Sequence, residues 1–259
     1  MRKFFSTASF AGLALLGATT VVAQDGAGAA TASRSYDLGD FEGISVVGPH
    51  HVVISVGAGF SVRAEGPQQT LADTEVEVED GRLRIHPVDD DRWERRCGER
   101  DGERRWRCWH NYEPATFHVT LPRISSASLV GGGNMRIDRV EGREFSASVA
   151  GSGDLDVAAL RVDDAHFSIA GSGNLAARGS ARHARVTIAG SGNLRAREVT
   201  SEEAAVSIAG SGDVALTVRD DARVSIVGGG EVEIAGPARC AVSRFGGGRV
   251  RCNGESIAG

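Results

Sequence analysis

Hydrophobic and polar residues alternate in short runs along most of the chain, and in its second half these runs meet at glycines. Between Leu129 and Val250 each unit reads apolar, Ser or Thr, apolar, Ala, Gly, Ser or Gly, Gly, Asn or Asp, apolar. Residues 169–175 and 188–194 are two clear copies, both with the sequence IAGSGNL. Because a period of two residues is that of a β-strand, the pattern predicts a strand on each side of a glycine corner.

The glycine phrase returns at nearly constant spacing. Its leading glycines are Gly131, Gly151, Gly171, Gly190, Gly210, Gly228 and Gly246, which are 18 to 20 residues apart. A period of about twenty residues with strands and no helices is typical of a solenoid in which each repeat forms one turn. The sequence therefore predicts an all-β solenoid whose Gly-rich repeats, with G-S-G-[ND] turns, span residues 124–252.

The period also predicts which side chains lie above one another. Small and medium apolar residues should point inward: Val149, Leu155, Ile169, Leu175, Ile188, Leu194, Val206, Ile208, Val224 and Ile226. A polar ladder should follow the corners: Asn134, Asp154, Asn174, Asn193, Asp213 and Glu231. A second ladder of hydroxyls should precede them: Ser148, Ser168, Thr187, Ser207, Ser225 and Ser243. Stacked polar side chains can satisfy one another, so the ladders are expected to be structural, although the hydroxyl ladder could also present a flat face to glycan or ice.

Residues 41–123 have the same alternation without the regular glycine spacing, and we expect them to form the N-terminal β-rich part of the solenoid. Strands are predicted at residues 44–47, 50–56, 60–64, 75–79, 82–88 and 115–121. Asp80-Gly81 between two of them is a hairpin signal, and residues 68–72 can form one helical turn. His50 and His51 are adjacent on a strand, so they should point to opposite faces.

The segment 89–112 interrupts this pattern. It contains the three tryptophans, Trp93, Trp106 and Trp109, and seven arginines, five of which (Arg95, Arg96, Arg104, Arg105 and Arg107) we single out with the tryptophans as candidate binding residues. Aromatic rings interleaved with arginines suit sugar rings or anionic groups. The alternative is a hairpin that satisfies itself, with its tryptophans packed on the body and its arginines paired with nearby acids.

The N-terminus has the pattern of an export signal. Arg2 and Lys3 precede a short apolar run that ends in Val21-Val22-Ala23, which predicts a secretory signal over residues 1–23. Residues 24–40 are expected to be flexible and residues 253–259 to form a C-terminal tail. No later segment has the ~20 uninterrupted apolar residues of a membrane span. We therefore expect an exported protein in the periplasm, outside the cell or at its surface.

The net charge bears on the partner of the protein, and the cysteines bear on its disulfides. Without Arg2 and Lys3 the chain has 27 basic and 34 acidic residues and a net charge of −7, which makes nucleic acid an improbable partner. The four cysteines predict two disulfides, with Cys97–Cys108 and Cys240–Cys252 the simplest of the three pairings that four cysteines allow. Cys252 falls in the inward register of Ile234, so the second bridge should close the last turn across the Gly246 corner.

These repeats resemble those of the head GIN domain family, bacterial exported proteins described as auto-transporter adhesin heads. The resemblance rests on the G-S-G-[ND]-apolar copies at 151, 171, 190 and 210, on the β-rich segment 41–57 and on Leu121-Pro122 before the repeats. It implies a right-handed, single-stranded parallel β-helix and no catalytic residues. The insertion at 89–112 and the terminal cysteines look like departures from the family.

Other chemistry finds little support. A calcium nonapeptide needs a nine-residue period, a P-loop needs Lys and a helix, and the histidines have no metal spacing, so neither a metal nor a cofactor is predicted. Pairs of carboxylates could serve a polysaccharide lyase or hydrolase: Asp154 with Asp156, Asp163 with Asp164, or Asp220 with Asp221. An active site should break the repeat, however, and most of these residues obey it.

The sequence thus favours a non-enzymatic interaction module of the envelope or surface that contacts glycan or an envelope protein. A polysaccharide-active enzyme is the alternative. A self-assembling structural protein is the third reading, with oligomers formed end to end or side by side, because an open solenoid end is an unpaired strand edge.

Overall fold

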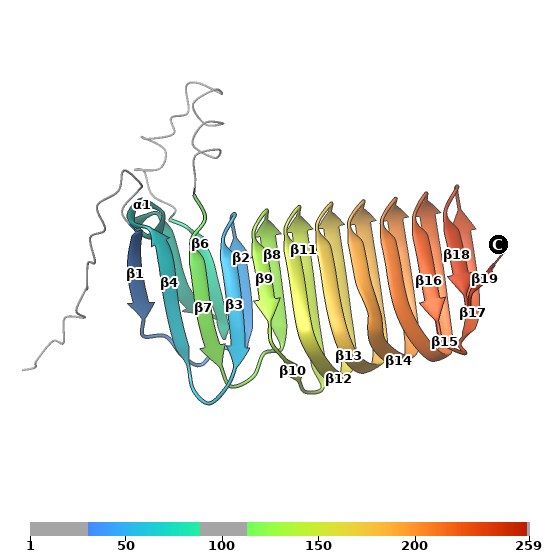
Figure 1. Ribbon diagram of the computed structural model, residues 1–259, viewed down its shortest axis with the longest axis horizontal. Coiled ribbons are helices and arrows are strands. Elements are labelled where there is room, and N and C mark those ends of the chain that lie inside the picture. The colour runs from blue at the N-terminus through green and yellow to red at the C-terminus, as the bar shows by residue number, and fades with distance from the viewer. Residues whose placement is uncertain (1–30, 89–112, 258–259) are drawn as a thin grey trace, which may run out of the picture.

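Strands stacked along one axis account for nearly all of the computed structural model, which describes residues 31–88 and 113–257 (Figure 1). The strands before the glycine repeats are β1 (Thr31–Tyr36), β2 (Gly43–Val47), β3 (His51–Val56), β4 (Ser61–Pro67), β5 (Thr74–Glu79), β6 (Arg82–Pro87) and β7 (Thr116–Leu121). The strands of the repeats are β8 (Ser126–Gly131), β9 (Asn134–Ile137), β10 (Val140–Glu141), β11 (Glu144–Gly151), β12 (Asp154–Gly171), β13 (Asn174–Gly190), β14 (Asn193–Gly210), β15 (Asp213–Gly228), β16 (Glu231–Ala235), β17 (Arg239–Phe245), β18 (Arg249–Cys252) and β19 (Glu255–Ser256). One short helix, α1 (Gln68–Ala72), lies at the N-terminal end.

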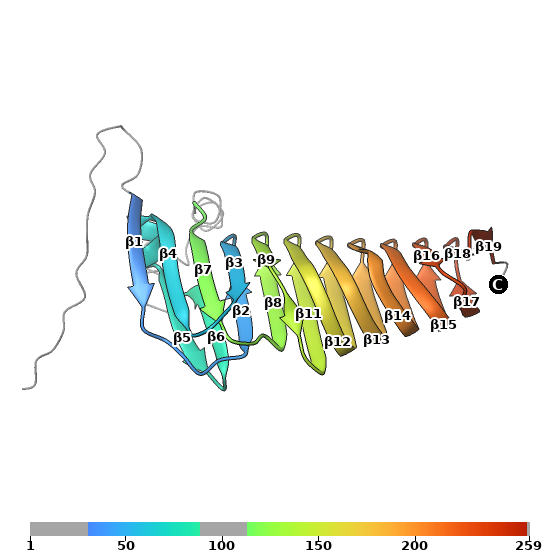
Figure 2. The ribbon, with the colours of Figure 1, turned by 60° about the horizontal axis from the view of Figure 1, so that its bottom comes forward.

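The repeats form a parallel β-solenoid, which confirms the predicted fold. Each turn pairs in parallel with the next, and equivalent residues face one another, as in Ile169 opposite Ile188 and Ile188 opposite Ile208. Two faces result, since each turn runs along one face after its corner and returns along the other (Figures 1 and 2). We call them the polar face (β3, β9, the first parts of β12 to β15, β16 and β18) and the serine face (β2, β8, β11, the last parts of β12 to β15, and β17).

The corners are glycines because the backbone of one turn lies against the backbone of the next. Gly171 has a φ of +118°, a conformation that side chains disfavour. Two residues later, a Cβ added to Gly173 would lie 2.4 Å from the carbonyl oxygen of Gly153. The amides of Ser172 and Gly173 donate to the carbonyl oxygen of Gly151 at 2.8 and 2.9 Å, so the corners are also hydrogen-bonded from turn to turn.

The core is one column of side chains inside the coil. All ten residues predicted to point inward are buried. Large and small residues alternate between turns: Phe145 pairs with Ala165, and Ala147 pairs with Phe167. The rings therefore fill a narrow interior without overlapping, as close packing of a core requires.

The N-terminal end differs from the repeats because several of its strands are antiparallel. β5 and β6 form the predicted hairpin, with φ of 50° at Asp80 and 70° at Gly81, and β4 pairs antiparallel with β7. The prediction that residues 24–40 are flexible is wrong for 31–36, which form β1 and pair antiparallel with β4. β1 gains its order from the open edge of β4 and from Tyr36, which packs against the core.

The last turn closes the core with polar groups and a disulfide. Arg244 takes the inward position that Ile226 holds one turn earlier, and its guanidinium donates to the carbonyl oxygen of Gly248 at 2.9 Å. Cys240 and Cys252 form the predicted disulfide, joining the serine face to the polar face across the end of the core. Beyond Cys252 the chain is not a plain tail, because β19 turns back and pairs antiparallel with β18.

The stacked corners predict that one added methyl group has very different effects at two neighbouring glycine positions. Gly173→Ala should lower the free energy of unfolding by more than about 2 kcal/mol, because the Cβ meets the backbone of the turn before it. Gly132→Ala is the matched control, since its Cβ would meet only the Ser152 hydroxyl at 3.5 Å, and it should cost less than about 0.5 kcal/mol. Urea denaturation followed by far-ultraviolet circular dichroism measures both, and equal losses would contradict the account of the corners.

Candidate functional site

The serine face is a flat strip of short side chains. Its central column, the serine ladder, contains Ser45, Ser128, Ser148, Ser168, Thr187, Ser207, Ser225 and Ser243 in register. Beside it the alanine column contains Val47, Val130, Ala150, Ala170, Ala189, Ala209, Val227 and Phe245. At ~4.8 Å per strand, the eight strands give a strip roughly 34 Å long.

The alanine column leaves apolar surface in water. Val130 is 39% exposed, Val227 54% and Phe245 79%. Single exposed apolar residues are ordinary on a protein surface, but these lie in one column beside a row of hydroxyls. A surface that offers apolar contact and hydrogen bonds side by side suits an extended amphipathic ligand.

A hollow of about 490 Å³ lies on the C-terminal half of this face. Thr187, Ser207, Ser225 and Ser243 of the serine ladder line it. The hollow is also lined by a column on the side of the serine ladder opposite the alanine column. This column contains Arg185, Ala205, Arg223 and Ala241, one residue from each successive turn. The small residues at 205 and 241 leave open space beside the two arginines.

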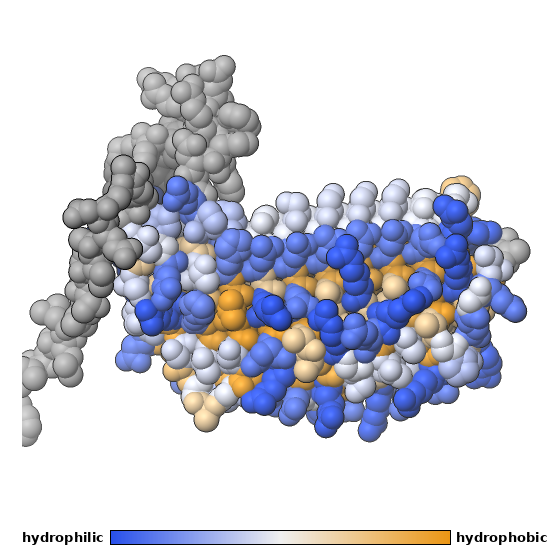
Figure 3. All heavy atoms as spheres, in the orientation of Figure 1, coloured by the Kyte–Doolittle hydropathy of each residue, from blue (hydrophilic) through white to orange (hydrophobic). Residues whose placement is uncertain are grey.

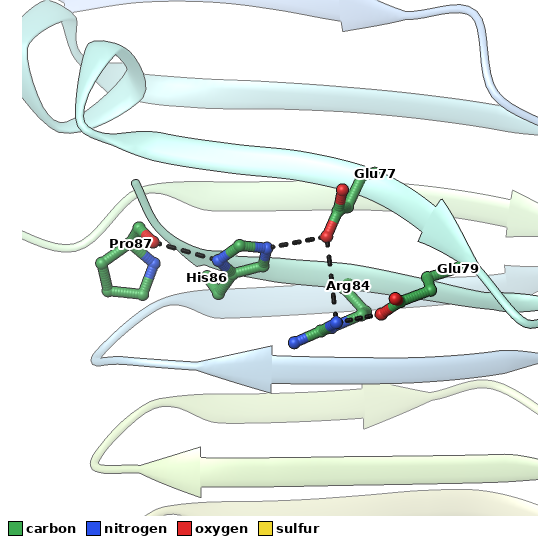
Figure 4. Close-up of polar contacts among 5 residues, drawn as sticks. All are labelled: Glu77, Glu79, Arg84, His86 and Pro87. Atoms are coloured by element: carbon green, nitrogen blue, oxygen red, sulfur yellow. Dashed lines mark hydrogen bonds and ion pairs between the residues drawn. The ribbon is translucent and has the colours of Figure 1, made fainter. Parts of the chain in front are cut away.

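Charged residues of the β5–β6 hairpin bound the N-terminal end of the serine face. Arg84 pairs with Ser45 and so stands at the end of the serine ladder. Its guanidinium contacts Glu79 and lies 3.9 Å from Glu77, whose carboxylate lies 3.1 Å from Nε2 of His86 (Figure 4). These side chains satisfy one another, so they end the face and do not form a reactive centre.

The polar face carries the predicted polar ladder. The Asn174 amide donates to Asp154 at 2.8 Å and the Asn193 amide donates to Asn174 at 2.9 Å. The backbone amide of Asp213 donates to Asn193 Oδ1 at 3.1 Å. In Figure 3 a hydrophilic row follows the pale corners along the whole solenoid. These contacts join each turn to the next, which supports a structural role for the ladder.

The paired carboxylates do not gather into one site. Arg178 lies 3.0 Å from Asp156, Arg182 lies 3.3 Å from Asp163, and His183 lies 3.1 Å from Asp164. Asp221 pairs with Arg239 at 2.8 Å, while Asp220 is exposed. Over the described part of the chain, no three His, Cys, Asp or Glu residues are close enough to hold a metal ion.

The insertion at 89–112 lies outside the described residues, and with it the candidate binding residues Trp93, Arg95, Arg96, Arg104, Arg105, Trp106, Arg107 and Trp109 and the cysteines Cys97 and Cys108. The repeat predicts the hydroxyl ladder, but it did not lead us to the hollow and its two arginines. The sequence does contain a signal for them, because one position of the repeat is Arg185, Ala205 and Arg223 in three successive copies.

His50 is the one described group whose pKa is strongly displaced. It replaces the buried second glycine of the corner, because the first turn reads G-P-H-H where later turns read G-S-G-N. Its ring packs edge-on against Phe117, and the amide of Ala115 donates to its Nδ1 at 3.3 Å. Burial, with a smaller contribution from His51, lowers the pKa of His50 to about 4. Burial in the core makes His50 a structural group, whereas His51 points outward, as predicted.

Comparison with known proteins gives one family. The family model described as "Putative auto-transporter adhesin, head GIN domain" matches residues 40–238. No curated protein matches the chain. None of the helices among residues 31–88 and 113–257 is long and apolar enough to cross a bilayer.

Solved structures share the fold at low sequence identity. A protein from Bacteroides fragilis titled a putative adhesin is 18% identical, with a TM-score of 0.74, over 85% of this chain and 95% of its own. A putative adhesin from Parabacteroides merdae is also 18% identical, with a TM-score of 0.64, over 87% and 96%. A protein from Parabacteroides distasonis titled a putative lipid binding protein is 19% identical, with a TM-score of 0.61, over 88% and 98%. At such identity the similarity establishes the fold alone.

The buried His50 predicts a loss of stability in mild acid. Well above pH 6.5 the imidazole is neutral in both the folded and the unfolded chain, so the full stability is present. As the pH falls from 6.5 to 4 the unfolded chain takes up the proton first, and the free energy of unfolding should drop by about 2 to 3 kcal/mol between pH 7 and 4.5 on account of this group.

Urea denaturation of wild type and His50→Gln at the two pH values measures this contribution. The variant should lose that part of the pH dependence, whereas His118→Gln, which removes an exposed imidazole from β7, should keep it. An unchanged pH dependence in His50→Gln would show that the group does not titrate as described.

Proposed function

Because the chain belongs to the head GIN domain family, we propose that it is an exported, non-enzymatic interaction module that binds a surface molecule through its serine face. The family suggests an adhesin-like role. Export rests on the signal pattern of residues 1–23, and the compartment we propose is the periplasm or the cell surface.

The serine face is the observation that carries the proposal. Eight strands present one hydroxyl each in a straight row, and no side chain of the serine ladder is larger than threonine. A hydroxyl both donates and accepts hydrogen bonds, so each hydroxyl of the row can donate to a sugar hydroxyl or accept a hydrogen bond from one. The alanine column beside it offers apolar contact to the carbon faces of the rings.

We therefore propose an extended glycan as the ligand, with an envelope protein as the competing partner. A glycan lying along the solenoid axis meets an equivalent pair of columns at every turn, so binding contacts add up along the polymer. The flatness of the strip favours such a ligand over a compact molecule, which would need an enclosed pocket.

The alternative is a polysaccharide-active enzyme of the same fold. Its candidate carboxylates belong to ladders and ion pairs that recur along the solenoid, which favours a structural role for them. Release of sugar products that Asp154→Ala or Asp213→Ala abolishes would overturn the non-enzymatic proposal.

Blocking the strip with one long side chain should abolish glycan binding. Ala209→Gln places a long neutral side chain in the alanine column and is expected to weaken binding at least tenfold on a glycan array and in co-sedimentation with insoluble polysaccharides. Ala176→Gln is the matched control, because it puts the same side chain outward on the polar face and should change binding less than twofold. Equal effects of the two variants would rule out the serine face as the binding surface.

The insertion at 89–112 remains our second proposed contact. Replacing Trp93, Trp106 and Trp109 together with alanine should weaken binding in the same assays and leave the circular dichroism of the β-solenoid unchanged. Loss of the β signal would instead assign the tryptophans to packing on the body. Unchanged binding would leave the serine face as the sole contact.

A further inference from the structure

We propose that the glycan bound by the serine face is acidic, and that one of its carboxylates binds over Ala205 between the guanidinium groups of Arg185 and Arg223. This inference rests on the proposed function, because it names the class of glycan that the same face selects.

The register of three neighbouring turns builds the site. Arg185, Ala205 and Arg223 are paired residues of β13, β14 and β15, and they all point outward beside the hollow. The two arginines are two turns apart, roughly 10 Å along the axis, and alanine leaves the space between them open. Arginine side chains are long enough to converge on one group placed in that space.

The charges of the hollow favour an anion. Among the described residues that line it, only these two arginines are charged. Within the described ranges neither guanidinium has an ion pair or a hydrogen bond, whereas Arg178, Arg182 and Arg239 in the same turns or next to them each pair with a carboxylate. A guanidinium recognises a carboxylate through two parallel hydrogen bonds, which makes this the group that fits best.

The next column of the same face contains four acids, Glu144, Asp164, Glu203 and Asp221, and none of them lines the hollow. Glu203 is exposed two residues before Ala205 on β14, and Asp221 is bound to Arg239 at 2.8 Å. They flank the arginine column on the side away from the serine ladder, so a ligand on the ladder approaches the arginines first. The hydroxyls of Thr187, Ser207 and Ser225 then lie beside the bound carboxylate and can bond the sugar that carries it.

The test compares acidic polymers with a neutral one, and polygalacturonate and its methyl ester are the pair that differs in charge. Binding of polygalacturonate, alginate and hyaluronate to the full chain would be measured by isothermal titration calorimetry, beside the methyl ester of polygalacturonate as the neutral partner. We expect at least one acidic polymer to bind, the methyl ester to bind at least tenfold more weakly, and added salt to weaken the acidic complex. Arg185→Ala and Arg223→Ala should each weaken acidic binding about tenfold. Arg195→Ala is the control, because Arg195 is an exposed arginine of the polar face.

A second pair of variants separates charge from bulk. Ala205→Glu places a carboxylate of the protein itself between the two arginines and should abolish acidic binding. Ala205→Gln has the same size without the charge and should retain at least a tenth of the affinity. Thermal unfolding of each variant checks that the solenoid is intact.

The outcomes distinguish this inference from the proposed function. Equal binding of acidic and neutral polymers, blocked by Ala209→Gln, would overturn the acidic preference and leave the glycan face in place. No binding of any polymer would overturn both. Arginine-dependent binding of anionic phospholipid vesicles without polysaccharide binding would overturn the choice of glycan in favour of a lipid headgroup.

Discussion

The contact between stacked glycine corners determines the rest of the solenoid. Each corner lies against the backbone of the one before it, so close that a Cβ at Gly192 would stand 2.3 Å from the carbonyl oxygen of Gly173. That approach fixes the height of a turn at one strand spacing and brings equivalent residues into register. The stacked core, the polar ladder and the serine face all follow, because each is the same position repeated along one axis.

The ends of the coil are where this constraint is relaxed. In the described part of the chain no glycine corner is stacked before the first one, and there a histidine side chain fits at the position where later turns have glycine. At the other end Arg244 and the Cys240–Cys252 bridge cover apolar side chains that no further turn would bury. Solenoids need such caps, because each turn buries its apolar surface only against a neighbour.

The two faces have different roles, since the polar face stabilises the solenoid and the serine face is the surface that we propose binds a ligand. On the polar face amides and carboxylates hydrogen-bond from turn to turn, and long charged side chains pair with one another. The serine face has short side chains, a row of hydroxyls, exposed apolar residues and two arginines that meet no carboxylate of the described chain. Its polar groups therefore remain available to a ligand, which is why we place recognition there.

The sequence alone determined the solenoid, the inward residues and the β5–β6 hairpin, because a local period of two and a repeat of about twenty residues specify strand, corner and register. For Cys240 and Cys252 it offered the simplest of three pairings, and the structure shows that bridge. The same repeat predicts Asn174 above Asp154 in a polar ladder, and the structure confirms that placement. Only the tertiary structure showed that residues 31–36 complete a sheet, that His50 is buried, and that Arg185 and Arg223 flank an open hollow. Each of these features depends on which strand edge or cavity a residue meets in a neighbouring turn. A repeat in the sequence specifies where a residue lies within its turn, but it does not specify how much space the neighbouring turns leave around that residue.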